Sequence, residues 1–146
     1  MAGQIELTVV TPEREVVCAS VDEITAPGWE GEFGVLPSHA PFLALIRTGE
    51  LMYRRRSERS FMTVGFGFVE VLPERVTVMI ETAEKEEEID LARAIAARDS
   101  AMKSLSGQVV DADVERARAA LMRALTRIRV AQRRSPAERR LGRPGG

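Results

Sequence analysis

The sequence predicts a β + α protein, with an N-terminal antiparallel β-sandwich over residues 1–84 and a C-terminal antiparallel two-helix hairpin over residues 85–134. Residues up to Thr82 form short β-branched segments separated by turn residues, whereas the next residues are rich in Ala, Leu and Arg at helical spacing. The charge divides near the same place, with a net −8 over residues 1–88 and +7 over residues 89–146. A flexible Arg/Gly/Pro tail is expected over residues 135–146.

Nine short segments support the sandwich. In Val76–Glu81, two valines and one isoleucine alternate with polar or more weakly apolar residues, the period-two pattern of a half-buried strand. Turn residues such as Thr11–Arg14 and Pro73–Glu74 separate the segments, which is typical of a sandwich or barrel. The expected strands are Ile5–Val10, Glu15–Ala19, Val21–Ala26, Gly34–Leu36, Leu43–Arg47, Glu50–Arg55, Arg59–Val64, Phe68–Leu72 and Val76–Glu81.

The first helix is expected to follow these strands. Glu84 and Glu86–Glu88 are placed at its start, because acidic residues in a first turn favour the helix dipole. Its expected apolar stripe, which Arg98 interrupts, consists of Leu91, Ile95, Met102 and Leu105. An adjacent stripe of small residues would let another helix approach closely and consists of Ala94, Ala97 and Ala101.

The second helix is expected to begin after a break around Gly107, with Asp111 as its N-cap. Its near-heptad seam consists of Val114, Ala117, Leu121, Leu125, Ile128 and Ala131. Two helices joined by a short loop form an antiparallel pair that has little core of its own. The hairpin is therefore either a movable interaction element or permanently packed on the sheet, and the pattern leaves both interpretations open.

No catalytic or metal-binding constellation is visible. The single cysteine, Cys18, excludes an internal disulfide, and the single histidine, His39, excludes a multi-histidine metal site. His39 is expected to be a turn residue that bonds to backbone. No phosphate-binding Gly-x-x-x-x-Gly-Lys loop is present, and the run Gly28-x-x-Gly31-x-x-Gly34 is interpreted as turn glycines. The start lacks signal-peptide features, and the longest apolar run, Phe42–Ile46, is too short to insert into a membrane.

The second helix is rich in arginine. Its arginines could form an ordinary solvated face, bind phosphates, or dock on an acidic protein surface. Few aromatic residues accompany them, since Trp29 and Tyr53 lie in the β part, so nucleic acid is the weakest of these interpretations.

Three ordered motifs resemble the epsilon subunit of bacterial F-type ATP synthase. Gly31–Pro41 resembles the family's Gly-x-x-Gly-x-x-Pro-x-His-Ala-Pro segment. The segment from Gly67 to Val78 is similar to its last β-hairpin, and Ile89–Ala94 is similar to its Ile/Leu-Asp-x-x-Arg-Ala motif. The resemblance extends from about Ile5 to Arg134.

The resemblance implies a non-catalytic subunit of the central rotor stalk that helps to couple proton flow to rotation. The sandwich would bind the gamma subunit and the c-ring, peripheral to the cytoplasmic face of the bacterial inner membrane. The residues implied on this side are Gly31, Pro37, His39, Ala40 and Pro41. The extended hairpin would meet acidic segments of the alpha and beta subunits and block ATP hydrolysis. The residues implied there are Arg116, Arg118, Arg123, Arg127, Arg129 and Arg133.

No cofactor is required, but some members of this family bind ATP as a regulatory ligand between the two helices. The matching residues are Ile89, Asp90, Arg93, Ala94, Arg123 and Arg127, which would make the chain an ATP-sensing module. Where those members carry a further arginine, this chain has Ser100, and Arg98 points about 200° away around the helix. This departure favours the absence of tight ATP binding. Alternatively, the motif stabilises the folded hairpin through an Asp90–Arg93 pair.

Overall fold

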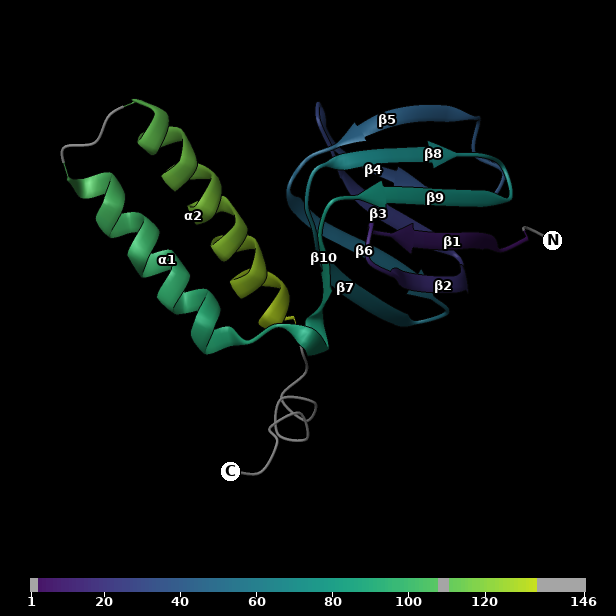
Figure 1. The fold of residues 1–146 in the computed structure, drawn as a ribbon. Coiled ribbons are helices and arrows are strands. Elements are labelled where there is room, and N and C mark those ends of the chain that lie inside the picture. Colours follow the sequence, from purple (N-terminus) through teal and green to yellow (C-terminus); the bar gives the residue numbers. More distant parts are fainter. Residues whose placement is uncertain (1–2, 108–110, 134–146) are drawn as a thin grey trace, which may run out of the picture. The chain divides into compact units, whose positions relative to one another are not determined.

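The computed structural model describes residues 3–107 and 111–133. The chain divides into two compact units, and the boundary lies between Lys85 and Glu86. The first unit is a ten-stranded sheet, and the helices belong to the second unit (Figure 1). The strands are β1 (Ile5–Val10), β2 (Glu15–Val21), β3 (Glu23–Gly28), β4 (Gly31–Val35), β5 (Phe42–Ile46), β6 (Gly49–Arg55), β7 (Glu58–Val64), β8 (Gly67–Val71), β9 (Arg75–Ile80) and β10 (Ala83–Lys85).

The sheet follows the order β10-β7-β6-β3-β5-β8-β9-β1-β2, with β4 paired to β3 off this path. β5 and β6 are consecutive, but β5 pairs with β8 whereas β6 pairs with β7 and β3. The chain thus passes from one layer of a sandwich to the other. All nine expected strands overlap observed strands, and the prediction of a sandwich followed by two helices is confirmed.

The sandwich core follows the predicted period-two alternation. In β1, Ile5, Leu7 and Val9 are fully buried, while the residues between them are more accessible. β9 repeats the pattern with Val76, Val78 and Ile80. Because branched side chains fit a pleated, half-buried surface, these strands build one continuous apolar core between the two layers.

The acidic segment does not form the first turn of a helix, so that prediction is wrong. Glu84 lies in β10, and Glu86–Glu88 form the short 3₁₀ helix η1. Helix α1 (Leu91–Ser106) begins only after Asp90, whose side chain accepts a hydrogen bond from the Arg93 backbone amide at 3.2 Å. Asp90 is therefore the N-cap, and it fixes the start of the helix downstream of the acidic segment.

The buried face of α1 is the predicted stripe of small residues at Ala94 and Ala101, although Ala97 is exposed, and it is not the predicted apolar stripe. Ala94 and Ala101 are buried, whereas Leu91 and Met102 are exposed. Residues 94, 98, 101 and 105 share one heptad-spaced face that includes Arg98. This face lets α1 and α2 (Asp111–Ala131) approach closely as an antiparallel pair (Figure 1).

The buried residues of α2 follow the predicted seam only in part, since Thr126 and Val130 are buried outside it. Ala117, Ile128 and Ala131 are buried as predicted, but Ala124 is buried in place of Leu125. Leu125 lies one residue, about 100° of rotation, off this face. The expected N-cap role of Asp111 concerns a side chain outside the described residues, as does the tail over residues 135–146. No helix within residues 3–107 and 111–133 is long and apolar enough to cross a membrane.

Candidate partner-binding site

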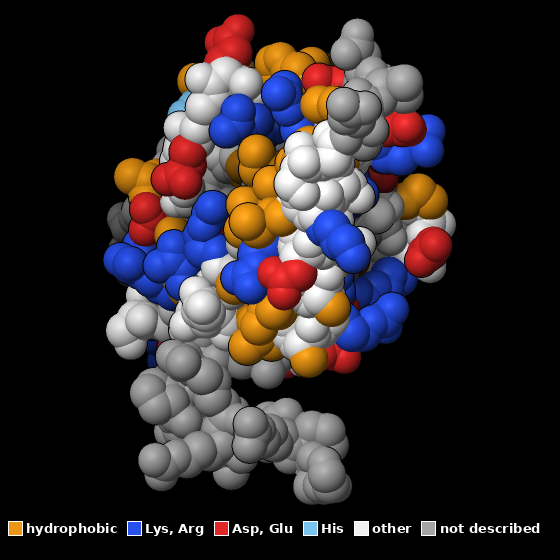
Figure 2. Space-filling view, turned by 90° about the vertical axis from the view of Figure 1, so that its left-hand side faces the viewer, with side chains coloured by type: hydrophobic (Ala, Val, Ile, Leu, Met, Phe, Trp, Pro, Cys, Tyr) orange, Lys and Arg blue, Asp and Glu red, His pale blue; other side chains and the backbone are white. Residues whose placement is uncertain are grey.

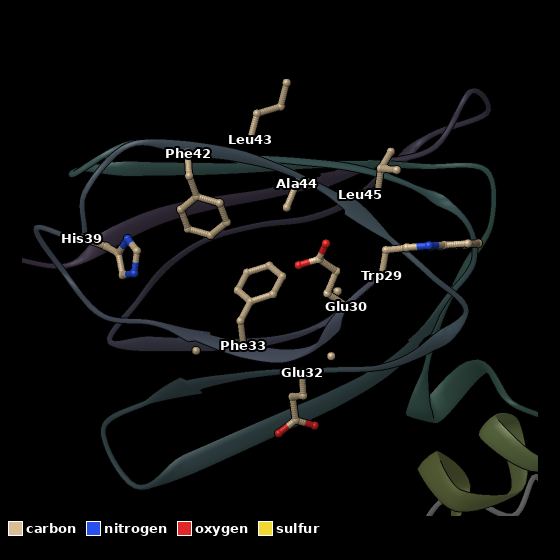
Figure 3. A pocket seen from close by; sticks show the side chains of 12 residues that line it. Trp29, Glu30, Glu32, Phe33, His39, Phe42, Leu43, Ala44 and Leu45 are labelled. Atoms are coloured by element: carbon tan, nitrogen blue, oxygen red, sulfur yellow. The ribbon is translucent and has the colours of Figure 1, made fainter.

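A groove of about 560 Å³ opens between the β3–β4 hairpin and β5. Phe33 and Phe42 point toward each other from opposite sides, with His39 at one end and Trp29 at the other (Figure 3). The two phenylalanine rings meet edge to face, with centroids 5.3 Å apart. This arrangement is a favourable aromatic geometry, so the pair fills the gap between the two layers and forms the apolar floor of the groove.

Two glycines shape the hairpin that forms one side of the groove. A Cβ on Gly28 would lie 2.7 Å from the Gly31 carbonyl oxygen, so the backbone itself occupies that space. Gly31 has φ of 137°, which residues with side chains rarely adopt. The prediction that this glycine run permits a tight turn between strands is confirmed for these two positions.

The segment after β4 makes a turn that orients His39. The His39 N–H donates to the Leu36 carbonyl at 3.2 Å, and Ser38 has φ of 66°. Pro37 followed by a residue with positive φ is the pattern of a type II turn. His39 Nδ1 lies 2.8 Å from the Ala40 carbonyl oxygen, and its ring packs against Phe42. His39 is therefore a turn residue that bonds to backbone, as predicted.

The structure brings together two of the five residues implied for partner binding on the sandwich. Gly31 and His39 both line the groove. Pro37, Ala40 and Pro41 do not line it but belong to the connection that holds His39 in place. Ala40 and Pro41 are exposed on that connection, and Pro37 is half-buried.

An exposed apolar row adjoins the groove, and the sequence prediction did not include it. Leu45, Phe68 and Met79 are opposite one another in the register of β5, β8 and β9, and all three are exposed. Edge-to-face and tilted ring contacts extend the row from Phe68 through Phe66 to Trp29, which is 59% exposed. The sequence did contain a signal for this row. In the alternating pattern of each strand, these residues occupy outward-facing positions, which are normally polar.

The second unit carries the other implied residues. Arg116, Arg118, Arg123, Arg129 and Arg133 are exposed, and Arg127 is half-buried. Arg118 makes a 3.7 Å ion pair with Glu115, which is exposed and therefore contributes little to stability. On the face shown in Figure 2, basic side chains are interspersed with acidic and apolar ones.

The residues implied for ATP binding have mixed environments. Ile89 and Ala94 are buried, Asp90 caps α1, and Arg93 and Arg123 are exposed. The Arg93 backbone N–H donates a hydrogen bond to the Asp90 carboxylate, which is a capping contact and not the expected ion pair. A groove of about 500 Å³ does lie between α1 and α2, but none of the six implied residues lines it. Its lining residues are Ala97, Ser100, Ala101, Ser104, Asp113, Arg116, Ala117 and Ala120.

Comparisons with known proteins cover both units. Residues 4–86 match the family described as ATP synthase, Delta/Epsilon chain, beta-sandwich domain, and residues 87–132 match its long alpha-helix domain. The chain is 45% identical over 133 residues to a protein from Syntrophobacter fumaroxidans named ATP synthase epsilon chain, covering 91% of this chain and 99% of the relative. It is 48% identical over 132 residues to the protein of that name from Citrifermentans bemidjiense, covering 90% and 96%.

A solved structure shares the fold. A chain of the Euglena gracilis mitochondrial ATP synthase OSCP/F1/c-ring assembly aligns with a TM-score of 0.78 at 24% identity. The alignment covers 89% of this chain and 82% of that chain. Since the two family matches follow one another along nearly the whole chain, the resemblance seen in the three motifs is confirmed. The chain is thus a subunit of a synthase and not its catalytic subunit, and it belongs to the epsilon-chain family of ATP synthase.

Proposed function

We propose that this chain works in the central stalk of a bacterial F-type ATP synthase, where it couples proton flow to ATP synthesis and inhibits ATP hydrolysis. In this proposal the sandwich binds the gamma subunit and the c-ring, and the arginines of α2 bind acidic segments of the alpha and beta subunits. The chain is then a peripheral protein at the cytoplasmic face of the inner membrane.

The exposed apolar row carries the first half of the proposal. Large apolar side chains exposed singly are ordinary, but a contiguous group of them marks an interaction surface. Leu45, Phe68 and Met79 form such a group on one face, and the Trp29–Phe66 ring contact extends it. Aromatic residues and methionine are enriched at the centre of protein interfaces, because they remove much apolar area from water at small conformational cost.

The arginine face of α2 carries the second half. Most of these guanidinium groups are exposed, and residues 89–146 have a net charge of +7. Arginine binds carboxylates in a bidentate geometry, and a concentrated positive surface steers association with an acidic partner. Such a surface explains why an inhibitory contact would depend on the helices and not on the sandwich.

Binding of the gamma subunit to full-length variants tests the first half. Phe68→Glu places a carboxylate in the middle of the apolar row and is expected to weaken binding of gamma by a factor of about ten to a hundred. Met102→Glu on α1 is the matched control, because Met102 is similarly exposed but belongs to the other unit. Equal binding of gamma by both variants would refute the apolar row as the rotor contact.

A further inference from the structure

The second unit has no aromatic residue on which an adenine base could stack. Residues 86–146 contain no phenylalanine, tyrosine, tryptophan or histidine. Aromatic side chains are the usual platform on which proteins hold a base. The two apolar residues implied for ATP binding do not replace such a platform, because Ala94 is fully buried and Ile89 is only 6% exposed. Both side chains are already packed inside the protein and offer little surface to a ligand.

The acidic residue implied for ATP binding already has a structural task. The Asp90 carboxylate accepts the backbone N–H of Arg93 at 3.2 Å and caps α1. The first N–H groups of a helix have no partner inside the helix, so a ligand that took this carboxylate would leave one of them without its cap. The motif from Ile89 to Ala94 is therefore explained by the start and the packing of the first helix.

The groove between α1 and α2 does not have the charge that a triphosphate needs. Asp113 and Arg116 are the only charged residues among the eight that line it, and their charges cancel. The other six are alanines and serines. Phosphate groups are bound by several cationic donors that converge on their oxygens. Arg93, Arg123 and Arg127 do not supply them, because none of these three lines the groove.

Ser100 is the position at which a cationic donor is missing. It lines the groove and lies seven residues after Arg93, which places both residues on one face of α1. The resemblance implies a further arginine at this position, and such a side chain would bring a guanidinium to the groove. Arg98 does not replace it, because Arg98 forms a 3.0 Å ion pair with Asp99 and lies on another side of the helix.

We propose that the hairpin of this chain is not an ATP site, and that its inhibition of hydrolysis does not depend on ATP bound to the chain. This inference rests on the proposed function, because it specifies the regulation of the same inhibitory helices. The residues of the Ile89–Ala94 motif then serve the fold, since Asp90 caps α1 while Ile89 and Ala94 are packed in the hairpin unit. The serine at position 100 accounts for the missing affinity.

Titration of the full-length chain with ATP and Mg²⁺, followed by calorimetry, tests the binding half. The wild type is expected to have a Kd above about 1 mM, and Ser100→Arg is expected to bind about ten- to a hundredfold more tightly, the effect of one charge-assisted hydrogen-bonding group. Met102→Arg is the matched control. It adds the same charge at an exposed position of α1, about 160° around the helix from Ser100, and should bind like the wild type. Micromolar binding by the wild type, or equal affinities of the two arginine variants, would overturn the inference.

ATP hydrolysis by the catalytic head tests the regulatory half separately. The ratio of the hydrolysis rates with and without the wild-type chain is expected to be the same at low and at saturating ATP. If the chain binds ATP at micromolar concentration and its inhibition falls as ATP is added, the inference is wrong and the proposed function stands. If the chain binds ATP weakly but does not inhibit at any ATP concentration, the proposed inhibition fails, whereas the absence of an ATP site stands.

Discussion

The two units of this chain bury their apolar residues in different ways. The sandwich encloses branched side chains such as Leu7, Val9 and Ile24 almost completely, while the seams of the helical hairpin are lined largely by alanine. Several large apolar side chains of the hairpin, namely Met102, Met122 and Leu125, remain substantially exposed. A unit that buries little apolar area gains little stability from folding. The sandwich therefore gains more stability from the burial of apolar side chains than the hairpin does.

The largest effect is expected from the same substitution made in each unit. Leu7→Ala removes a fully buried side chain and should lower the free energy of unfolding by about 2 to 5 kcal/mol. Leu125→Ala, on a side chain that is 40% exposed, should cost less than about 1 kcal/mol. Urea unfolding followed by circular dichroism measures both. Similar losses of unfolding free energy in the two variants would contradict the difference in burial between the sandwich core and the helix seam.

At the alanine seam, enlarging a side chain is expected to destabilise the protein, whereas in the sandwich core the destabilising change is a truncation. Ala124→Leu adds apolar volume where α1 and α2 approach closely, and it should destabilise the hairpin by about 1 to 3 kcal/mol. Ala119→Leu, at an exposed position of the same helix, is the control and should be nearly neutral. Hydrogen exchange of the helix amides reports the difference. A stabilising Ala124→Leu would mean that the helices are not in close contact at this position.

A smaller effect is expected in the turn before His39. Ser38 has φ of 66°, a conformation that glycine adopts without strain. Ser38→Gly should raise the free energy of unfolding by up to about 1 kcal/mol, and Gly31→Ala should lower it by about as much, because Gly31 has φ of 137°. Thermal unfolding of the two variants checks the pair. A loss of stability in Ser38→Gly would show that the serine side chain supports the turn.

The smallest effect concerns acid stability of the sandwich. The backbone N–H of Arg56 donates to the Asp22 carboxylate at 2.7 Å and lowers the pKa of Asp22 below its ordinary value of 3.8. Because the folded-state pKa is lower than the unfolded one, this contact stabilises the fold above pH 3.8 and is lost as the pH falls through the folded-state value. Thermal unfolding between about pH 6 and pH 2 should therefore show a weaker acid dependence for Asp22→Asn than for the wild type. If the two proteins show the same pH dependence of thermal unfolding, Asp22 does not contribute to the acid stability of the sandwich.

Most of the fold was accessible from sequence because it depends on local patterns. The alternation in β1 and β9 and the change of period after Thr82 identified the strands and helices. β10 was missed because Ala83–Lys85 is a strand only through its pairing with β7. Within the seam of α2, Leu125 was predicted in place of Ala124 because leucine is the more hydrophobic residue, whereas close helix packing favours the smaller side chain.

The candidate site was less predictable. Gly31 and His39 could be named from their motif. The groove itself lies between residues 28–34 and 39–45, and a local sequence pattern does not predict that these segments face each other. The apolar row of Leu45, Phe68 and Met79 depends on the register of three strands that are distant in sequence. A search for large apolar residues at the outward-facing positions of each expected strand would have identified the members of the apolar row. It would not have shown that these residues lie next to one another.

The central claim is that the sandwich binds the gamma subunit and the c-ring, and that the arginines of α2 inhibit ATP hydrolysis. The most direct test measures ATP hydrolysis by the catalytic head together with binding of gamma, for the wild-type chain and for an Arg123→Glu, Arg129→Glu double variant. Both positions are exposed on α2, and an Arg59→Glu variant controls for the change of charge on the sandwich. The account predicts that the double variant binds gamma like the wild type but no longer inhibits. Full inhibition by a double variant that binds gamma would contradict it.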